Sequence, residues 1–139
     1  MRDEIDRFVD VPDGFLYCQT HGEGQDVVLV NAGAADLRMW ESTISWLSQV
    51  ARVTTFDYRD TGLSSPGSKP YSEIEDIAAV MDAGGVLSAV LVGVSDGVWA
   101  RRIVSQAPIA SLTMIPEADH FPMLSAPQQF KRFLRETLG

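Results

Sequence analysis

The sequence predicts a three-layer α/β/α fold around a mostly parallel sheet that begins with an antiparallel hairpin. Short apolar runs alternate with longer segments of helical periodicity, which is the pattern of parallel strands joined by crossover helices. At the start, residues 8–11 and 15–20 read as two strands around the turn-forming Pro12-Asp13-Gly14. The 139 residues are 45% hydrophobic, enough for one core, so we treat residues 1–139 as a single domain.

The first strand–helix–strand unit lies between residues 27 and 56. Residues 27–30 form a continuous apolar run, as expected of a strand covered on both faces. Residues 37–50 read as a helix, and the next strand is predicted at residues 53–56. One helical face collects Trp40, Thr43, Ile44 and Leu47.

A second helix follows a polar turn at residues 57–65. Ser72 and Glu75 have the spacing of a capping box, which predicts a helix start at Ser72. The glycine pair 84–85 ends this helix. Its expected apolar stripe is Ile74, Ile77, Ala78 and Met81.

Two elements close the chain. Residues 111–115 read as a short strand, and a helix is predicted at residues 126–138. Because a right-handed crossover would join it to the strand at 89–92, the short strand is expected to pair beside that strand. The apolar face of the last helix is predicted to hold Phe130, Phe133, Leu134 and Leu138.

The most informative stretch is residues 87–107, where a buried strand at 89–92 meets a predicted helix at 98–107. Between them lies Gly93-Val94-Ser95-Asp96-Gly97, which is the G-x-S-x-G pattern of a nucleophile elbow. The flanking glycines relieve crowding in a sharp turn that exposes the Ser95 hydroxyl. The same turn directs the Asp96 backbone N–H toward the same space. A nucleophile and an oxyanion donor are the two requirements of acyl transfer.

Charge and composition exclude several classes of function. The formal net charge is −8 and the basic residues form no cluster, which argues against nucleic acid or an anionic membrane as partner. No apolar run reaches membrane-spanning length and no signal-peptide core is present, so a cytoplasmic protein is expected. The single cysteine, Cys18, is expected to be a buried thiol. With two histidines in all, a metal site is not expected, and His21 is assigned to a solvated loop at residues 21–26.

These motifs together resemble the α/β-hydrolase superfamily, over nearly the whole chain and in the family's order. Asn31-Ala32-Gly33 resembles its oxyanion loop, although His-Gly is usual where Asn31-Ala32 stands. Residues 56–64 resemble the turn after its next strand, with Asp60 where glycine is usual. Residues 93–97 resemble its elbow, and residues 117–122, which contain His120, resemble its histidine loop.

The resemblance implies a carboxylesterase that acts on small or activated esters without a cofactor. Ser95 would be the nucleophile and His120 the general base, with the backbone N–H groups of Gly33 and Asp96 as the oxyanion hole. A non-catalytic small-molecule-binding protein of the same fold and a cofactor-free perhydrolase are the alternatives.

The resemblance also implies a shortened, lidless form of the fold. The two strands, the lid and the acid-bearing loop that usually follow the elbow helix have no counterpart, and an engineered deletion would give the same sequence. The triad acid therefore stays open among Glu117, Asp119, Asp57, Asp60, a partner-chain residue or none. The strand at 111–115 would end the sheet with an exposed edge, which predicts a homodimer.

Overall fold

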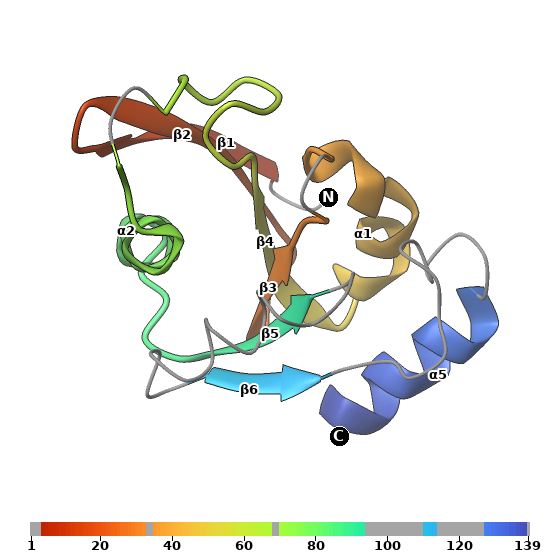
Figure 1. Cartoon of the computed structure of the whole chain (residues 1–139). Helices are drawn as coiled ribbons and strands as arrows, with labels where there is room; N and C mark the ends of the chain where they lie inside the picture. The colour runs from red at the N-terminus through yellow and green to blue at the C-terminus, as the bar shows by residue number, and fades with distance from the viewer. Residues whose placement is uncertain (1–3, 33–34, 68–69, 94–109, 114–126, 139) are drawn as a thin grey trace.

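The computed structural model describes residues 4–32, 35–67, 70–93, 110–113 and 127–138. It confirms the predicted fold class: a six-stranded sheet has helices on both faces, with α2 on one side and α1 and α5 on the other (Figure 1). The strands are β1 (Glu4–Val11), β2 (Gly14–His21), β3 (Gln25–Val30), β4 (Ala51–Phe56), β5 (Ala89–Gly93) and β6 (Ala110–Thr113). The helices are η1 (Leu37–Trp40), α1 (Glu41–Leu47), α2 (Glu73–Ala83) and α5 (Pro127–Leu138).

The sheet order is β1-β2-β4-β3-β5-β6. The strands β1, β2 and β4 pair antiparallel, whereas β4, β3, β5 and β6 are parallel. The expected pairing of the short strand beside the elbow strand is confirmed, because Ala89 of β5 lies opposite Ala110 of β6. That strand begins one residue earlier than predicted, and the predicted elbow helix at 98–107 lies outside the described residues.

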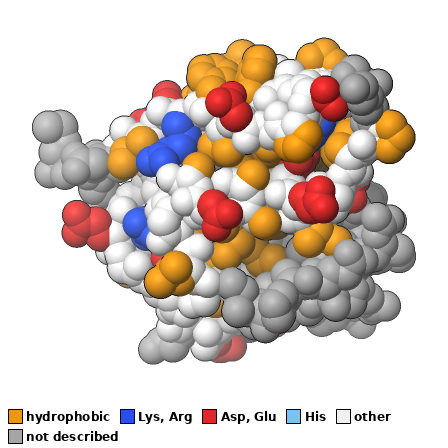
Figure 2. Space-filling model, turned by 90° about the vertical axis from the view of Figure 1, so that its left-hand side faces the viewer, with side chains coloured by type: hydrophobic (Ala, Val, Ile, Leu, Met, Phe, Trp, Pro, Cys, Tyr) orange, Lys and Arg blue, Asp and Glu red, His pale blue; other side chains and the backbone are white. Residues whose placement is uncertain are grey.

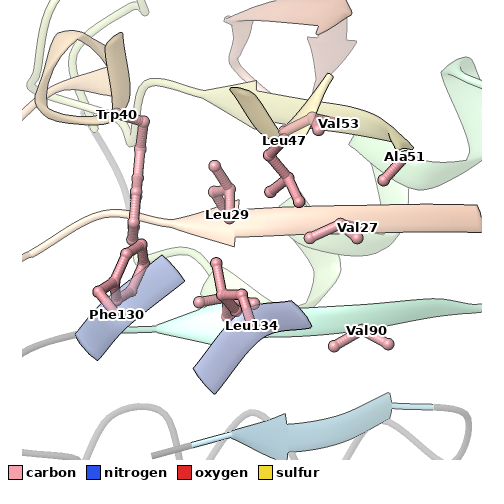
Figure 3. Close-up of a cluster of buried hydrophobic side chains, with 10 residues drawn as sticks. Val27, Leu29, Trp40, Leu47, Ala51, Val53, Val90, Phe130 and Leu134 are labelled. Carbon is pink, nitrogen blue, oxygen red and sulfur yellow. The ribbon is translucent and has the colours of Figure 1, made fainter. Parts of the chain in front are cut away.

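One core lies between the sheet and the helices α1 and α5 (Figure 3). The rings of Trp40 and Phe130 stack with centroids 6.1 Å apart, which joins the start of α1 to α5. The expected buried stripe at 37–50 is confirmed, but the segment opens as the 3₁₀ turn η1 and its helix ends at Leu47. The buried members of this core are Val27, Leu29, Trp40, Leu47, Ala51, Val53, Val90, Val92, Phe130 and Leu134.

The second core lies under α2, on the side of the molecule where Figure 2 shows acidic side chains interspersed with hydrophobic ones. The capping box is formed: the Ser72 hydroxyl accepts a hydrogen bond from the Glu75 N–H at 3.3 Å. The predicted stripe is wrong at Ala78, which is exposed, while Val80 is buried. The helix faces the sheet through Ile77 and Val80, and its buried Asp76 pairs with an arginine described below.

The hairpin has a two-residue turn, since Val11 lies opposite Gly14 and Asp13 adopts a positive φ of 64°. The strand β2 continues through His21, so the loop assignment of this histidine is wrong. Strand pairing on both sides extends β2 that far, because His21 lies opposite Glu4 of β1 and Val53 of β4. Cys18 is buried, as predicted.

Candidate active site

The carboxyl ends of β3, β5 and β6 lie side by side at one edge of the sheet. Val30, the last residue of β3, pairs with Gly93, the last residue of β5. Val92 of β5 pairs in turn with Thr113, the last residue of β6. Neighbouring strands lie roughly 4.8 Å apart. The three ends therefore fall within about 10 Å of one another, at the edge where open α/β sheets bind ligands.

The predicted site residues follow these three strand ends in the sequence, but they lie outside the described residues. Gly33 follows β3, Ser95 and Asp96 follow β5, and His120 follows β6. The candidate acids Glu117 and Asp119 are also outside the described residues. The structure thus brings together the strands that precede the predicted oxyanion, nucleophile and base segments, and it describes the candidate acids Asp57 and Asp60.

Asn31, in the position where the family usually has histidine, fixes the backbone just before Gly33. Its buried side-chain Nδ2 donates to the Phe56 carbonyl at 2.7 Å, and its Oδ1 accepts from Trp40 Nε1 at 2.9 Å. The Tyr58 hydroxyl donates to the Asn31 carbonyl at 2.7 Å, and burial raises the pKa of Tyr58 well above its usual value. These bonds tie the end of β3 to β4 and to η1.

Asp57 holds the chain on the other side of Gly33. Its carboxylate is buried, and Oδ1 accepts from the Leu37 N–H at 2.8 Å while Oδ2 accepts from the Leu63 N–H at 2.9 Å. Leu37 opens η1, so this carboxylate joins the end of the loop that contains Gly33 to the turn after β4. Both carboxylate oxygens are engaged with backbone groups, which makes Asp57 a positioning residue in this structure.

Asp60 is an exposed turn residue. Its backbone has a positive φ of 69°, a conformation that favours glycine, which explains why glycine is usual at this position of the family's turn. Its Oδ1 accepts from the Gly67 N–H at 3.0 Å. The side chain therefore stabilises its own loop.

A buried ion pair that the sequence reasoning missed anchors the same turn. Arg59 Nε lies 2.9 Å from Asp76 Oδ2, and Nη2 donates to Oδ1 at 2.9 Å. Arg59 also donates to the Pro12 carbonyl at 3.0 Å and lies over the Tyr71 ring at 4.6 Å. Asp76 lies outside the apolar stripe predicted for this helix, so the sequence pattern carried no signal of the pair.

Metal sites and membrane-spanning helices are both absent from the described part of the chain. Within it, no group of three or more His, Cys, Asp or Glu side chains is placed to hold a metal ion. None of its helices is long and apolar enough to cross a membrane.

Comparison with known proteins finds no matching family model but several relatives. The chain is 33% identical over 100 residues to the zearalenone hydrolase of Bionectria ochroleuca, which covers 64% of this chain and 37% of that protein. It is 40% identical over 60 residues to the pimeloyl-acyl-carrier-protein methyl ester esterase of Aliivibrio fischeri, covering 42% and 23% respectively. The crystal structure of a predicted CIB-like hydrolase from Thermoplasma acidophilum superimposes over 99% of both chains with a TM-score of 0.78, at 14% identity.

The strand order, the sheet edge and these similarities define an α/β-hydrolase fold. The chain has this fold and is similar in sequence to proteins named as esterases and hydrolases. It spans well under half the length of the curated relatives it matches, 37% of one and 23% of the other.

Proposed function

We propose that this protein is a serine hydrolase that cleaves small or activated carboxylic esters. The observation that carries the proposal is the adjacency of β3, β5 and β6, whose carboxyl ends precede Gly33, Ser95 and His120. An oxyanion donor, a nucleophile and a base must meet around one carbonyl carbon, and neighbouring strand ends are a suitable starting point for that arrangement. The names of the two relatives, an esterase and a hydrolase, support the same reaction class.

In the proposed reaction, the Ser95 hydroxyl attacks the ester carbonyl while His120 takes its proton. The backbone N–H groups of Gly33 and Asp96 bind the developing oxyanion. His120 then protonates the leaving alkoxide, and a water molecule activated by the same histidine hydrolyses the acyl-enzyme. The residues alone supply every step, so the proposal includes no metal and no organic cofactor.

The orienting acid is the weakest part of this constellation. Asp57 already binds two backbone N–H groups, and Asp60 stabilises an exposed turn. We therefore propose that neither is the triad acid, which leaves Glu117, Asp119 or a partner-chain carboxylate for that role. Loss of the orienting carboxylate costs roughly 10⁴-fold in turnover in the serine proteases, so an enzyme without a substitute acid would be slow.

The test is hydrolysis of p-nitrophenyl acetate by the purified wild type beside Ser95→Ala and His120→Ala. Each substitution should lower turnover by several orders of magnitude, and the double variant should be no worse because the two groups act as a unit. An organophosphonate probe should label the wild type and leave Ser95→Ala unlabelled. Equal turnover in Ser95→Ala would refute the assignment, and an inert, unlabelled wild type would favour a non-catalytic binding protein.

We also propose that two chains associate through the β6 edge. The strand β6 is the last of the parallel strands, and none of the described residues forms a strand beyond it. The resulting dimer would use the same surface of both copies.

A further inference from the structure

At the opposite edge of the sheet, β1 directs a row of backbone N–H and C=O groups away from β2, and none of the described strands pairs with it. Val11 and Gly14 close a two-residue turn, which fixes which residues of β1 face β2 with their N–H and C=O groups. Val11 and every second residue before it direct their backbone N–H and C=O groups toward β2. The residues between them direct these groups away from the sheet. In the described part of the chain, no strand pairs with this outward row, which belongs to Glu4, Asp6, Phe8 and Asp10.

The side chains of the same residues share one face of the sheet and carry an unusual pairing of aromatic and acidic groups. Phe8 is 60% exposed although it is a large apolar residue, and its ring meets that of Phe15 edge-on with centroids 5.4 Å apart. The Tyr17 ring also packs against the Phe8 ring, with centroids 5.3 Å apart. The flanking carboxylates of Glu4, Asp6 and Asp10 are exposed.

These carboxylates exclude a second copy of this chain as the occupant. If two β1 strands paired antiparallel about a two-fold axis, residues of the same face would lie opposite one another. Any register that pairs most of the strand would place carboxylate against carboxylate, as with Glu4 opposite Asp10 or Asp6 opposite Asp10. Like charges directly opposite one another destabilise a strand pair.

We propose that β1 accepts an extended segment of a basic partner protein as an additional strand. The segment would carry Lys or Arg at alternate positions around one aromatic residue, to meet the carboxylates and the Phe8 ring on the same face. Main-chain bonds to the outward row would supply affinity, and the alternate side chains would supply specificity. The net charge of −8 attracts such a partner at longer range. This surface is at the far side of the sheet from β5 and β6, so it does not depend on the proposed hydrolysis.

The probe is a fluorescein-labelled peptide, Lys-Thr-Trp-Thr-Arg-Thr-Lys, followed by fluorescence anisotropy with the full chain. Saturable binding is expected, and Phe8→Ser should weaken it at least tenfold. Asp6→Pro should weaken it similarly, because proline removes an outward N–H without breaking the pairing with β2. The matched control is Glu136→Gln, which removes one exposed carboxylate from α5, the helix over β3 and β5, and should leave binding unchanged.

Two peptide controls keep the test independent of the folding of any variant. A peptide with Glu at the three basic positions should not bind, and a peptide of the same composition with its basic residues consecutive should bind at least tenfold more weakly. The proposal would be overturned if the peptide with consecutive basic residues bound as tightly as the alternating one. It would also be overturned if Asp6→Pro bound the alternating peptide as tightly as the wild type, because either result would show that charge attraction alone explains binding. A dimer that Phe8→Ser dissociates in light scattering would also overturn it, by assigning the edge to a second copy.

Discussion

Asp57 and Gly62 form a residue-level unit that sets the turn after β4. The Asp57 carboxylate occupies the space that a side chain at position 62 would need: a Cβ there would lie 2.0 Å from Asp57 Oδ2. Gly62 also has a positive φ of 48°. The glycine therefore lets the carboxylate reach both Leu37 and Leu63, and through Leu37 it fixes the chain that follows Gly33.

Gly62→Ala should accordingly destabilise the protein by about 2–4 kcal/mol, through the left-handed backbone and the collision with Asp57. The measurement is the free energy of unfolding in urea. Gly85→Ala is the matched control, because Gly85 has a φ of 69° and open space around its Cβ position. That variant should lose only about 1 kcal/mol. Equal losses would show that the Asp57 carboxylate is not held in place.

Cys18 carries a pH dependence of stability. Burial raises the pKa of its thiol from 9.0 to about 12. Above pH 9 the unfolded chain loses this proton and the folded chain keeps it, so the free energy of unfolding falls as pH rises. The contribution is fully present below pH 9 and is lost between about pH 9 and 12.

Urea unfolding at pH 8, 9 and 10 should show this fall, with a slope from Cys18 of at most about 1.4 kcal/mol per pH unit. Cys18→Ala removes the titrating group and should flatten the profile between pH 9 and 10, whatever its effect on stability at pH 8. Parallel profiles for the two proteins would mean that the thiol ionises as easily in the folded chain as in the unfolded one.

At the scale of elements, apolar periodicity predicted the positions of helices and strands in the sequence better than it predicted which face of a helix is buried. The face of the helix at 37–50 was predicted correctly, since Trp40, Thr43 and Leu47 are buried and Ile44 is partly buried against the same core. In α2 the pattern failed at Ala78, which is exposed, while Asp76 is buried against Arg59 on the side that faces the sheet. A carboxylate at a core-facing position carries no sign of its partner in the sequence.

The helix α5 covers the face of the parallel strands through Phe130 and Leu134, both of which are buried. Leu134→Ala should destabilise the protein by about 2–5 kcal/mol, because it removes apolar contacts and leaves a cavity against the sheet. Arg132→Ala, an exposed position of the same helix, should change the free energy of unfolding by less than about 0.5 kcal/mol. If both variants melt like the wild type, α5 does not pack on the sheet in solution.

At the scale of the whole molecule, the sequence predicted the fold class and the neighbouring positions of β5 and β6. The right-handed crossover rule leaves little choice once the two strands are found. The arrangement of Ser95 and His120 themselves stays a prediction, because loop conformation is set by contacts that periodicity does not encode. The supporting network of Asn31 and Asp57 also escaped prediction, since it depends on hydrogen bonds between segments far apart in the sequence.

The two edges of the sheet differ in what they can pair with. On β1, the carboxylates of Glu4, Asp6 and Asp10 would face one another in a pair of identical strands, which opposes self-association. On β6 the strand is short, and its apolar neighbour in the sheet, β5, is already covered on one face by α5. Self-pairing of β6 across a two-fold axis would satisfy its outer backbone groups, with the two strands antiparallel and the carboxyl end of each β6 beside the amino end of its partner.

Light scattering at micromolar concentration should therefore give twice the 15.2 kDa mass of one chain. Ser111→Pro and Leu112→Pro, made singly, test the interface, because alternate residues of a parallel edge strand point their N–H groups outward. One of the two should stay folded by circular dichroism and become monomeric, and its esterase turnover should fall if the partner chain lends a carboxylate. A wild type with a mass near 15.2 kDa and full turnover would rule out both the dimer and any catalytic contribution across it.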